Sequence, residues 1–191
     1  MTWNPAKTDA SLVLSNNNLT VAKASGFGSH AKVLGIAPAK TSPRTFKVRI
    51  DGVKDMGIGF ATAAEPLNST LLGASPTTSA CIFSTGWYQE NNGGWSQNAL
   101  LAKGQDVAVF YDPATKLASW TVNGSLILSR HLILSGDVFP AISLRYQEDK
   151  ATADFTQWVE AAVEPPPPPP PPPPSGEDYY VLITNNPDYT A

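Results

Sequence analysis

The sequence GQDVAVFYDPATKLASWTVNG, residues 104–124, predicts two antiparallel strands and the turn into a third. The apolar and aromatic run at 106–112 suits a pleated, largely buried strand. Residues 112–116 carry turn chemistry, because proline presets φ for a type I turn and aspartate accepts hydrogen bonds from the turn's own backbone. Residues 117–122 then alternate, and Asn123-Gly124 is a strong hairpin signal because both positions tolerate positive φ. Such a meander indicates an all-β domain.

The composition points to a globular body of low charge. The chain has 191 residues, of which 15% are charged, below the roughly 25% of an average domain. All 13 Lys and Arg and 13 of the 16 acidic residues precede the prolines at 165–174, so the body is neutral and the net charge of −3 comes from the tail. A neutral body offers no basic face for phosphate backbones, which argues against nucleic acid as a main partner.

The same sequence carries no export or membrane signal. The N-terminus has no apolar signal region, and no run approaches the about 18 apolar residues of a membrane span. We therefore expect an intracellular protein (cytosolic, cytoskeletal or virion-associated) that is neither secreted nor bound to a membrane.

Short strand patterns separated by turn signals recur up to residue 155, and we expect ten to twelve strands in two packed antiparallel sheets. The clearest is 45–51, where Phe46, Val48 and Ile50 alternate with Lys and Arg, as in a strand with one wet face. Pro140 predicts that the strand at 138–144 lies at an edge or at a bulge. The other expected strands include 11–15, 19–22, 31–36, 56–61, 80–84 and 151–155.

The order and spacing of several of these segments resemble those of a SPRY domain, the core of the B30.2 family. The pieces that carry the resemblance are 46–51, 58–61, 86–88, 104–124, 137–144 and 153–155. The resemblance implies a bent, two-sheet antiparallel β-sandwich of the SPRY/concanavalin-like type. It also implies that the loops at one end form a protein- or peptide-binding surface and that the family has no general catalytic residues. The loops differ from those of the best-known peptide-binding members, so no ligand contact is carried over.

Few residues offer catalytic or metal chemistry. His30 and His131 are far apart in sequence and have no neighbours at ligand spacing, and Cys81 suits a buried structural thiol. Paired-carboxylate glycosidase chemistry would need two carboxylates about 5–10 Å apart in a groove. Local hydrogen bonding at strand ends is the favoured role for the four aspartates at 51, 106, 112 and 137. We expect no enzyme, no catalytic residue, no metal and no cofactor.

Binding is better supported, through three loops at 37–44, 65–79 and 85–98. The third loop combines aromatic and asparagine side chains, which are typical of recognition surfaces. Its candidate partner-binding residues are Trp87, Tyr88, Asn91, Asn92 and Trp95. The alternative for Trp87 and Tyr88 is that they cover the end of the sandwich as part of the core, where we also expect Trp120 and Trp158.

The C-terminal part is an appendage. Residues 156–164 form a connector that could make one or two helical turns. The ten prolines at 165–174 predict an extended polyproline II arm of about 31 Å. A spacer is the favoured use, and binding to a profilin, SH3 or WW domain is the alternative. The tail at 175–191 contains a β-prone run that could add a strand to another molecule, with Tyr179, Tyr180, Val181 and Ile183 as candidate partner-binding residues.

Together these features predict a non-catalytic protein–protein interaction module at 1–155. We expect it to be a structural or adaptor subunit of a larger assembly, such as a capsid or a cytoskeletal array, with sandwich loops and tail docking on protein partners. A lectin-like, carbohydrate-binding sandwich is the alternative, suggested by the Asn-, Trp- and Tyr-rich loop.

Overall fold

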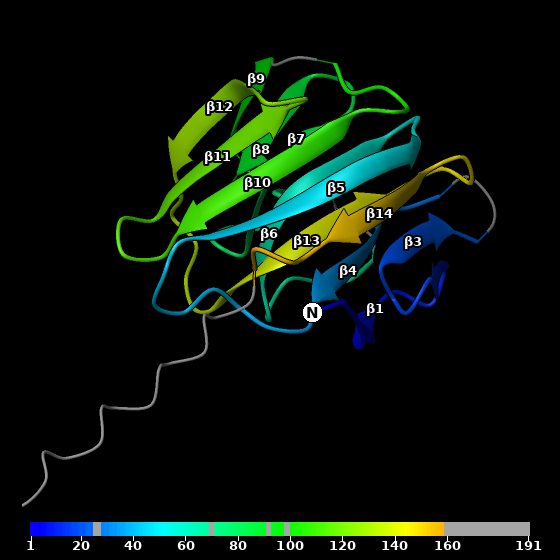
Figure 1. The fold of residues 1–191 in the computed structure, drawn as a ribbon, viewed down its shortest axis with the longest axis horizontal. Helices are drawn as coiled ribbons and strands as arrows, with labels where there is room; N and C mark the ends of the chain where they lie inside the picture. Colours follow the sequence, from blue (N-terminus) through cyan, green and yellow to red (C-terminus); the bar gives the residue numbers. More distant parts are fainter. Residues whose placement is uncertain (25–27, 69–70, 91–92, 98–99, 159–191) are drawn as a thin grey trace, which may run out of the picture. The chain divides into compact units, whose positions relative to one another are not determined.

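Two seven-stranded sheets form the part of the chain that the structure, a computed structural model, describes (Figure 1). That part comprises residues 1–24, 28–68, 71–90, 93–97 and 100–158, with the backbone alone for 93–97. The first sheet has the order β1 (Trp3–Thr8), β4 (Ala31–Gly35), β13 (Val138–Leu144), β6 (Met56–Thr62), β7 (Ser79–Phe83), β8 (Trp87–Glu90), β9 (Gly93–Gln97). The second has the order β12 (Ser125–His131), β11 (Leu117–Val122), β10 (Asp106–Asp112), β5 (Arg44–Gly52), β14 (Lys150–Asp154), β3 (Thr20–Lys23), β2 (Leu12–Ser15).

Every pair of neighbouring strands is antiparallel, and none of the described residues is helical. The predicted all-β, two-sheet sandwich is confirmed. The predicted ten to twelve strands are fewer than those found. β1 was not expected, and residues 85–98, which contain β8 and β9, were expected to form a large exposed loop or a loose hairpin.

The meander of the sequence lies in the second sheet. β10 and β11 pair in continuous register, with Trp120 buried beneath them. The Asp112 carboxylate accepts a hydrogen bond from the N–H of Ala114 at 2.9 Å, which closes the first turn. Asn123 and Gly124 have φ values of 48° and 83°, the left-handed conformations that a type I′ hairpin turn requires.

The main core lies between the sheets and is rich in aromatic side chains. Trp120 donates from Nε1 to the carbonyl of Ile58 at 3.0 Å, so its polar group is satisfied inside the core. Trp158 meets Phe46 edge-on at 5.6 Å and stacks on Phe60 at 6.0 Å, between ring centroids. Each such pair adds about 0.5–1.5 kcal/mol beyond its buried area. Both tryptophans predicted to be core residues are confirmed as such.

A second, smaller core covers the outer face of the first sheet. There Leu72 from the connection 63–78 packs with buried side chains of β4, β6, β7 and β13. Consequently β6 and β7 are buried at every residue, which explains their continuous apolar sequences. Gly59 leaves no room for a Cβ, because the Ala80 carbonyl and Cys81 of the adjacent strand approach it. The close approach therefore comes from the adjacent strand of the same sheet.

One end of the sandwich, called the turn end below, is fixed by a single carboxylate. Asp149 is fully buried and accepts four backbone N–H groups. Two come from Lys54 and Asp55 at 2.6 and 3.1 Å, and two from Arg145 and Tyr146 at 2.9 and 2.8 Å. The β5–β6 and β13–β14 turns are therefore joined through the Asp149 carboxylate and their own backbone N–H groups. An ion pair between Arg145 and Asp55 at 3.1 Å joins the same two turns.

The placement of Pro140 differs from the prediction. It lies in β13, an interior strand between β4 and β6, rather than at an edge. The ladder with β4 begins only at Ala141, and the proline ring lies beside Gly35 at the end of β4. Because Pro140 stands just beyond that ladder, its missing N–H is tolerated inside a sheet.

The described chain ends at Trp158, inside a turn in which its N–H donates to the Phe155 carbonyl at 2.9 Å. Residues 156–158 of the predicted connector are thus not helical. The chain divides into a compact unit, Met1–Glu160, and a second unit, Ala161–Ala191. The polyproline arm and the tail lie outside the described residues. The described part contains no helix that could cross a membrane.

Candidate functional site

The end opposite the turn end, called the loop end below, gathers the connections 37–43, 63–78, 113–116 and 132–137. Residues 132–137 make hydrogen bonds to several other segments at this end. The N–H of Ser135 donates to the Thr77 carbonyl at 2.9 Å, and the N–H of Ile133 donates to the Glu90 carboxylate at 2.8 Å. Parts of the second and third predicted loops therefore meet on one segment that the sequence had not singled out.

Two further connections meet at or beside this segment. Ala39 of the first predicted loop donates from its N–H to the carbonyl of Val138, the first residue of β13, at 2.8 Å. Leu132 donates to the Lys116 carbonyl in the connection 113–116 at 2.9 Å. Ser135-Gly136-Asp137 carries turn signals, and Gly136 has a φ of 98°. The preceding Leu132-Ile133-Leu134 gives no indication of a surface connection, and the partners of the segment depend on long-range contacts.

A pocket of about 400 Å³ opens at the loop end. Its apolar wall includes Pro113 and Ile133, and its charged groups are Lys40, Lys116 and Asp137. Ile133 is 52% exposed, and neither lysine makes an ion pair among the described residues. The pocket therefore offers an apolar contact beside cations that are free to meet a partner's carboxylates.

The second predicted loop is anchored more firmly than an exposed loop. Lys32 on β4 donates to Glu65 at 2.5 Å and to the Pro66 carbonyl at 2.6 Å, with both charged side chains fully buried. The other oxygen of Glu65 accepts from the hydroxyls of Thr78 and Ser79. The ion pair and its hydroxyl partners hold both ends of the connection 63–78 against the first sheet. Thr77, near the end of this connection, lies at the loop end.

The third predicted loop is a hairpin, and it separates the two aromatic residues at its start. Trp87 is 41% exposed, whereas Tyr88 is buried against Trp120 with ring centroids 5.8 Å apart. The Tyr88 hydroxyl donates to Glu90 at 2.6 Å, and burial together with this carboxylate raises the pKa of the phenol. Tyr88 is therefore a core residue, which corrects its assignment as a surface contact. Successive strand residues point to opposite faces, so only one of the two aromatics can reach solvent.

The remaining candidates are only partly placed. Trp95 belongs to β9, of which the backbone alone is described, and its neighbour Ser96 pairs with Tyr88. The other candidates lie outside the described residues: Asn91, Asn92, Tyr179, Tyr180, Val181 and Ile183.

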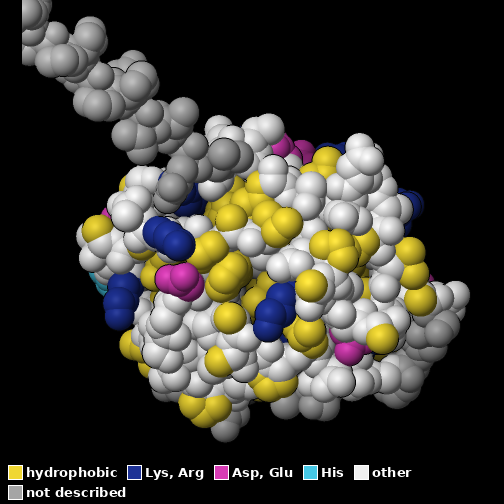
Figure 2. All heavy atoms as spheres, turned by 90° about the horizontal axis from the view of Figure 1, so that it is seen from below, with side chains coloured by type: hydrophobic (Ala, Val, Ile, Leu, Met, Phe, Trp, Pro, Cys, Tyr) yellow, Lys and Arg dark blue, Asp and Glu magenta, His cyan; other side chains and the backbone are white. Residues whose placement is uncertain are grey.

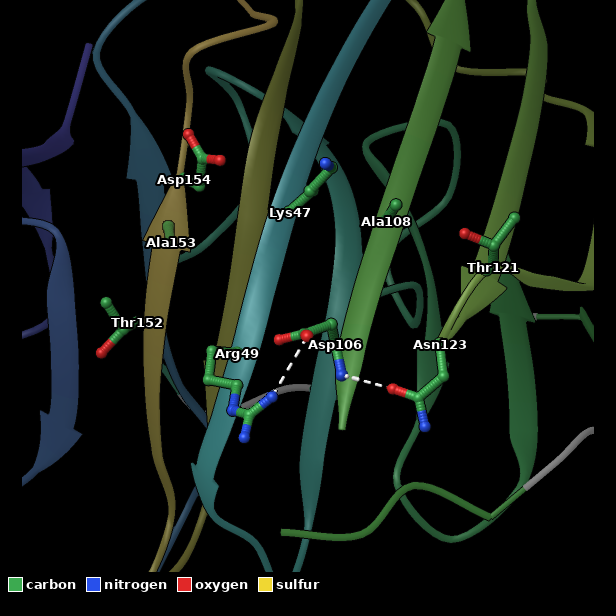
Figure 3. Close-up of a pocket in the computed structure, with 10 residues that line it drawn as sticks. Lys47, Arg49, Asp106, Ala108, Thr121, Asn123, Thr152, Ala153 and Asp154 are labelled. Atoms are coloured by element: carbon green, nitrogen blue, oxygen red, sulfur yellow. Dashed lines mark hydrogen bonds and ion pairs between the residues drawn. The ribbon is translucent and has the colours of Figure 1, made fainter. Parts of the chain in front are cut away.

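A second hollow, of about 500 Å³, crosses the outer face of the second sheet over β11, β10, β5 and β14 (Figure 3). The small side chain of Ala108 forms its floor, between the longer residues of neighbouring strands. Its charges are matched: Arg49 contacts Asp106 at 3.1 Å, and Lys47 lies opposite Asp154 in the β5–β14 register. This groove is neutral and has no aromatic residue among its lining, so it offers a partner little to bind beyond polar contacts.

The distribution of charged side chains on one face of the molecule (Figure 2) is consistent with the near-zero net charge of residues 1–164. Figure 2 shows the face that lies below in Figure 1, with Lys, Arg, Asp and Glu scattered over it and hydrophobic side chains gathered near its centre. No large area of a single charge is visible on that face.

The buried titratable side chains His30 and Cys81 have structural surroundings. Burial lowers the pKa of His30 to about 4, although Asp55 lies 3.6 Å from its Nε2. Burial also raises the pKa of the Cys81 thiol, and its Sγ donates to the Leu72 carbonyl. Among the described residues no three His, Cys, Asp or Glu side chains are arranged to hold a metal ion.

Local hydrogen bonding was predicted for all four strand-end aspartates, and among the described contacts it is confirmed for Asp112. Asp51 and Asp106 contact side chains of neighbouring strands that are distant in sequence. Asp51 accepts from the Thr152 hydroxyl at 2.7 Å, Asp106 contacts Arg49, and Asp112 closes its own turn. Asp137 lines the loop-end pocket instead.

Comparison with known proteins identifies the fold. The sequence matches no family model and no curated protein. Among solved structures, the SPRY domain of human HERC1 is 13% identical with a TM-score of 0.67, over 81% of this chain and 98% of that one. A human SPRY domain is 14% identical with a TM-score of 0.62, over 76% of this chain and 96% of that one. The TRIM65 PSpry domain is 12% identical with a TM-score of 0.65, over 80% and 90%. At these identities the similarity establishes architecture alone: the described chain has the two-sheet fold of SPRY domains.

Proposed function

We propose that this chain is a non-catalytic protein-interaction module whose loop end binds a protein partner. One observation supports the proposal above the others: the connections 63–78 and 113–116 and the strand β8 all bond to residues 132–137. The pocket beside this segment places apolar Ile133 near two lysines that make no ion pair with any described residue. A rigid sandwich that presents several loops at one end is a common design for recognition surfaces. The SPRY domains with the same fold add to this expectation as an analogy of fold.

The test begins with the partner captured by the full-length chain from its native source and identified by mass spectrometry. Ile133→Asp should weaken binding at least about tenfold, because covering an exposed isoleucine contributes about 1.5–3 kcal/mol. Val13→Asp is the matched control, since Val13 is 51% exposed on β2, the edge strand farthest from β12 in the same sheet. Equal binding by the two variants would rule out the loop end as the interface.

The β8–β9 hairpin is the second proposed contact of the same partner. Trp87 is its one described aromatic at the surface, and Asn91, Asn92 and Trp95 extend the proposal along the hairpin. Trp87→Ala should weaken binding without lowering stability, whereas Tyr88→Ala should destabilise the fold. A partner that binds the Trp87→Ala variant as tightly as the unaltered chain would remove the hairpin from the interface.

We further propose that the module works as a structural or adaptor subunit in a larger intracellular assembly, capsid-like or cytoskeletal. Its polyproline run would serve as a spacer, and its residues Tyr179, Tyr180, Val181 and Ile183 as a docking segment. Deleting 175–191 should prevent incorporation while leaving the circular dichroism of the domain unchanged. If purified profilin, SH3 or WW domains bind the full chain through 165–174 instead, the prolines are a ligand rather than a spacer.

The carbohydrate alternative has less support. Its natural location would be the groove on the second sheet, but that groove has no aromatic residue among its lining on which a sugar ring could stack. A glycan array that showed binding abolished by Lys47→Ala, and not by Ile133→Asp, would favour it over the protein-binding proposal.

A further inference from the structure

The sheets of the described chain end in four edge strands, and these differ in how well they are protected from further pairing. β1 contains Pro5 and an irregular register, β2 has four residues, and β9 has five. β12 has seven residues and no proline. Short length, proline and bulges are the usual protections of an edge strand. β12 has a bulge at Ile127 and one charged residue on its inner side, Arg130. Its second half, Leu128–His131, stays in regular register with β11.

The core is also incompletely covered at β12. Ile127 and Leu128 pack against the main core but remain partly exposed, and Leu126 is 64% exposed. Among the described residues no strand lies on the outer side of β12. An added strand would therefore satisfy backbone groups and complete the cover of apolar side chains in the same step.

The sequence supplies a segment with the right composition. Residues 179–184, Tyr-Tyr-Val-Leu-Ile-Thr, are consecutive β-formers, and Glu177 and Asp178 precede them. β12 ends in Arg130 and His131, both exposed. Only an antiparallel arrangement brings the acidic start of the segment to this basic end of β12, so charge fixes the direction of pairing.

The register follows from the regular half of β12. Tyr180 would lie opposite Arg130, Val181 opposite Ser129, and Leu182 opposite Leu128. Arg130 pairs with buried Ala118 on β11 and so lies on the inner side of the edge, where the ring of Tyr180 could cover it. Leu182 would then cover Leu128.

The spacer favours pairing between two molecules. The described chain ends at Trp158, which donates to the Ala37 carbonyl at the loop end, where β12 also ends. A straight run of ten prolines carries the segment about 31 Å away from that point. The ten other residues between Trp158 and Tyr179 span at most about 33–36 Å when fully extended. Reaching the β12 of the same molecule would require nearly all of that length to run back along the prolines, whereas a second copy imposes no such constraint.

We propose that residues 179–184 of one molecule add as an antiparallel strand to Leu128–His131 of β12 in a second copy of the chain. This inference rests on the proposed role of the tail as a docking segment and is independent of the partner bound at the loop end. Reciprocal exchange closes a pair of molecules, and one-way exchange builds an open chain.

The full-length chain allows a register-specific test, because its single cysteine, Cys81, is buried. Ser129→Cys and Val181→Cys chains are mixed and oxidised with oxidised glutathione, and covalent dimers are counted on a non-reducing gel. Ser15→Cys is the matched control, an exposed serine on the edge strand β2. We expect the Ser129–Val181 pair to cross-link at least tenfold faster than the Ser15–Val181 pair. The double substitution Glu177→Lys/Asp178→Lys in the Val181→Cys chain should slow this cross-linking. In a separate sedimentation experiment without added cysteines, Val181→Pro should make the chain monomeric.

Three results would overturn the proposal. Equal cross-linking at Ser129 and Ser15 would mean that β12 is not the docking edge. Rapid dimers of Ser129→Cys alone would mean that two β12 edges pair directly. A monomeric internal disulfide in the Ser129→Cys/Val181→Cys chain at high dilution would mean that the tail docks on its own domain. None of these results bears on the Ile133→Asp test, so the two proposals fail separately.

Discussion

Asp149 and Glu65 are both buried carboxylates, and they are neutralised in opposite ways. Asp149 accepts four backbone N–H groups from two turns and needs no cation. Glu65 depends on particular side chains, namely the ammonium of Lys32 and the hydroxyls of Thr78 and Ser79. Backbone donors are present whatever the neighbouring residues are, whereas a side-chain partner can be lost by one substitution. The donors around Asp149 therefore survive substitution of their own side chains, whereas the donors to Glu65 are side chains that one substitution can remove.

The largest effect is expected where an ion pair loses one member. Glu65→Leu leaves the buried Lys32 without its carboxylate and should lower the free energy of unfolding by about 3–5 kcal/mol. The double variant Lys32→Met/Glu65→Leu should recover most of this loss, because neither charge then remains buried. Urea unfolding of both variants measures the difference. A double variant as unstable as the single one would mean that the carboxylate, and not the unpaired cation, decides the stability.

A smaller loss is expected at the other carboxylate. Asp149→Asn keeps the shape but replaces one acceptor oxygen by an amide that faces two N–H donors, which should cost about 3 kcal/mol. Glu148→Gln, at the exposed neighbouring position, is the control and should change stability little. Loss of less than about 1 kcal/mol in Asp149→Asn would show that the four hydrogen bonds are replaceable by water.

The third prediction concerns pH, and it uses the buried His30 near the turn end. The pKa of His30 is about 4 in the fold and 6.5 without it, so the unfolded chain binds the proton more readily between these values. Stability is therefore complete above pH 6.5 and falls as the pH falls toward 4. Between pH 7 and pH 5 the loss should be about 2 kcal/mol.

Variants of the two histidines separate this contribution from those of the carboxylates. His30→Gln should remove the loss of stability between pH 7 and pH 5, whereas His131→Gln, exposed on β12, should keep it. Unfolding by urea at several pH values measures both. The same pH dependence in the His30→Gln chain would assign the effect to other groups.

The smallest effect is expected for charges that remain in water. Arg49 and Asp106 form an ion pair 3.1 Å long with both side chains more than half exposed. Arg49→Ala should lower the free energy of unfolding by no more than about 0.5 kcal/mol, and less in high salt. A loss above about 1 kcal/mol would mean that the arginine stem supports the sheet by packing.

The sequence was most informative where structure is decided locally. The β10–β11 hairpin and the two faces of β5 follow from turn residues and from alternation, which depend only on near neighbours. The same alternation placed Trp120 in the core. The same rule would have set Trp87 and Tyr88 on opposite faces had they been assigned to a strand, but the glycines and asparagines around them favoured a large loop or loose hairpin. That choice, and not the chemistry of Tyr88, led to its assignment to the surface.

What the sequence could not show depends on contacts between distant residues. Lys32 stands in an apolar strand with nothing nearby to suggest that Glu65 pairs with it inside the protein. Pro140 is tolerated in an interior strand because the pairing of β13 with β4 begins only at the next residue, Ala141. Where that pairing begins can be seen only in the assembled sheet. The segment 132–137 was missed for the same reason, since its hydrogen-bond partners lie in the connections 63–78 and 113–116 and on β8.

The position of Trp158 has a mechanical consequence. Its ring packs against both Phe46 and Phe60 in the core, and its Nε1 donates to the Ala37 carbonyl. A force applied through the chain beyond it would therefore first have to extract an aromatic side chain from the centre of the sandwich, before it could peel β14 from β5. If the C-terminal arm acts as a tether, tension along it is resisted by the middle of the domain and not by its edge.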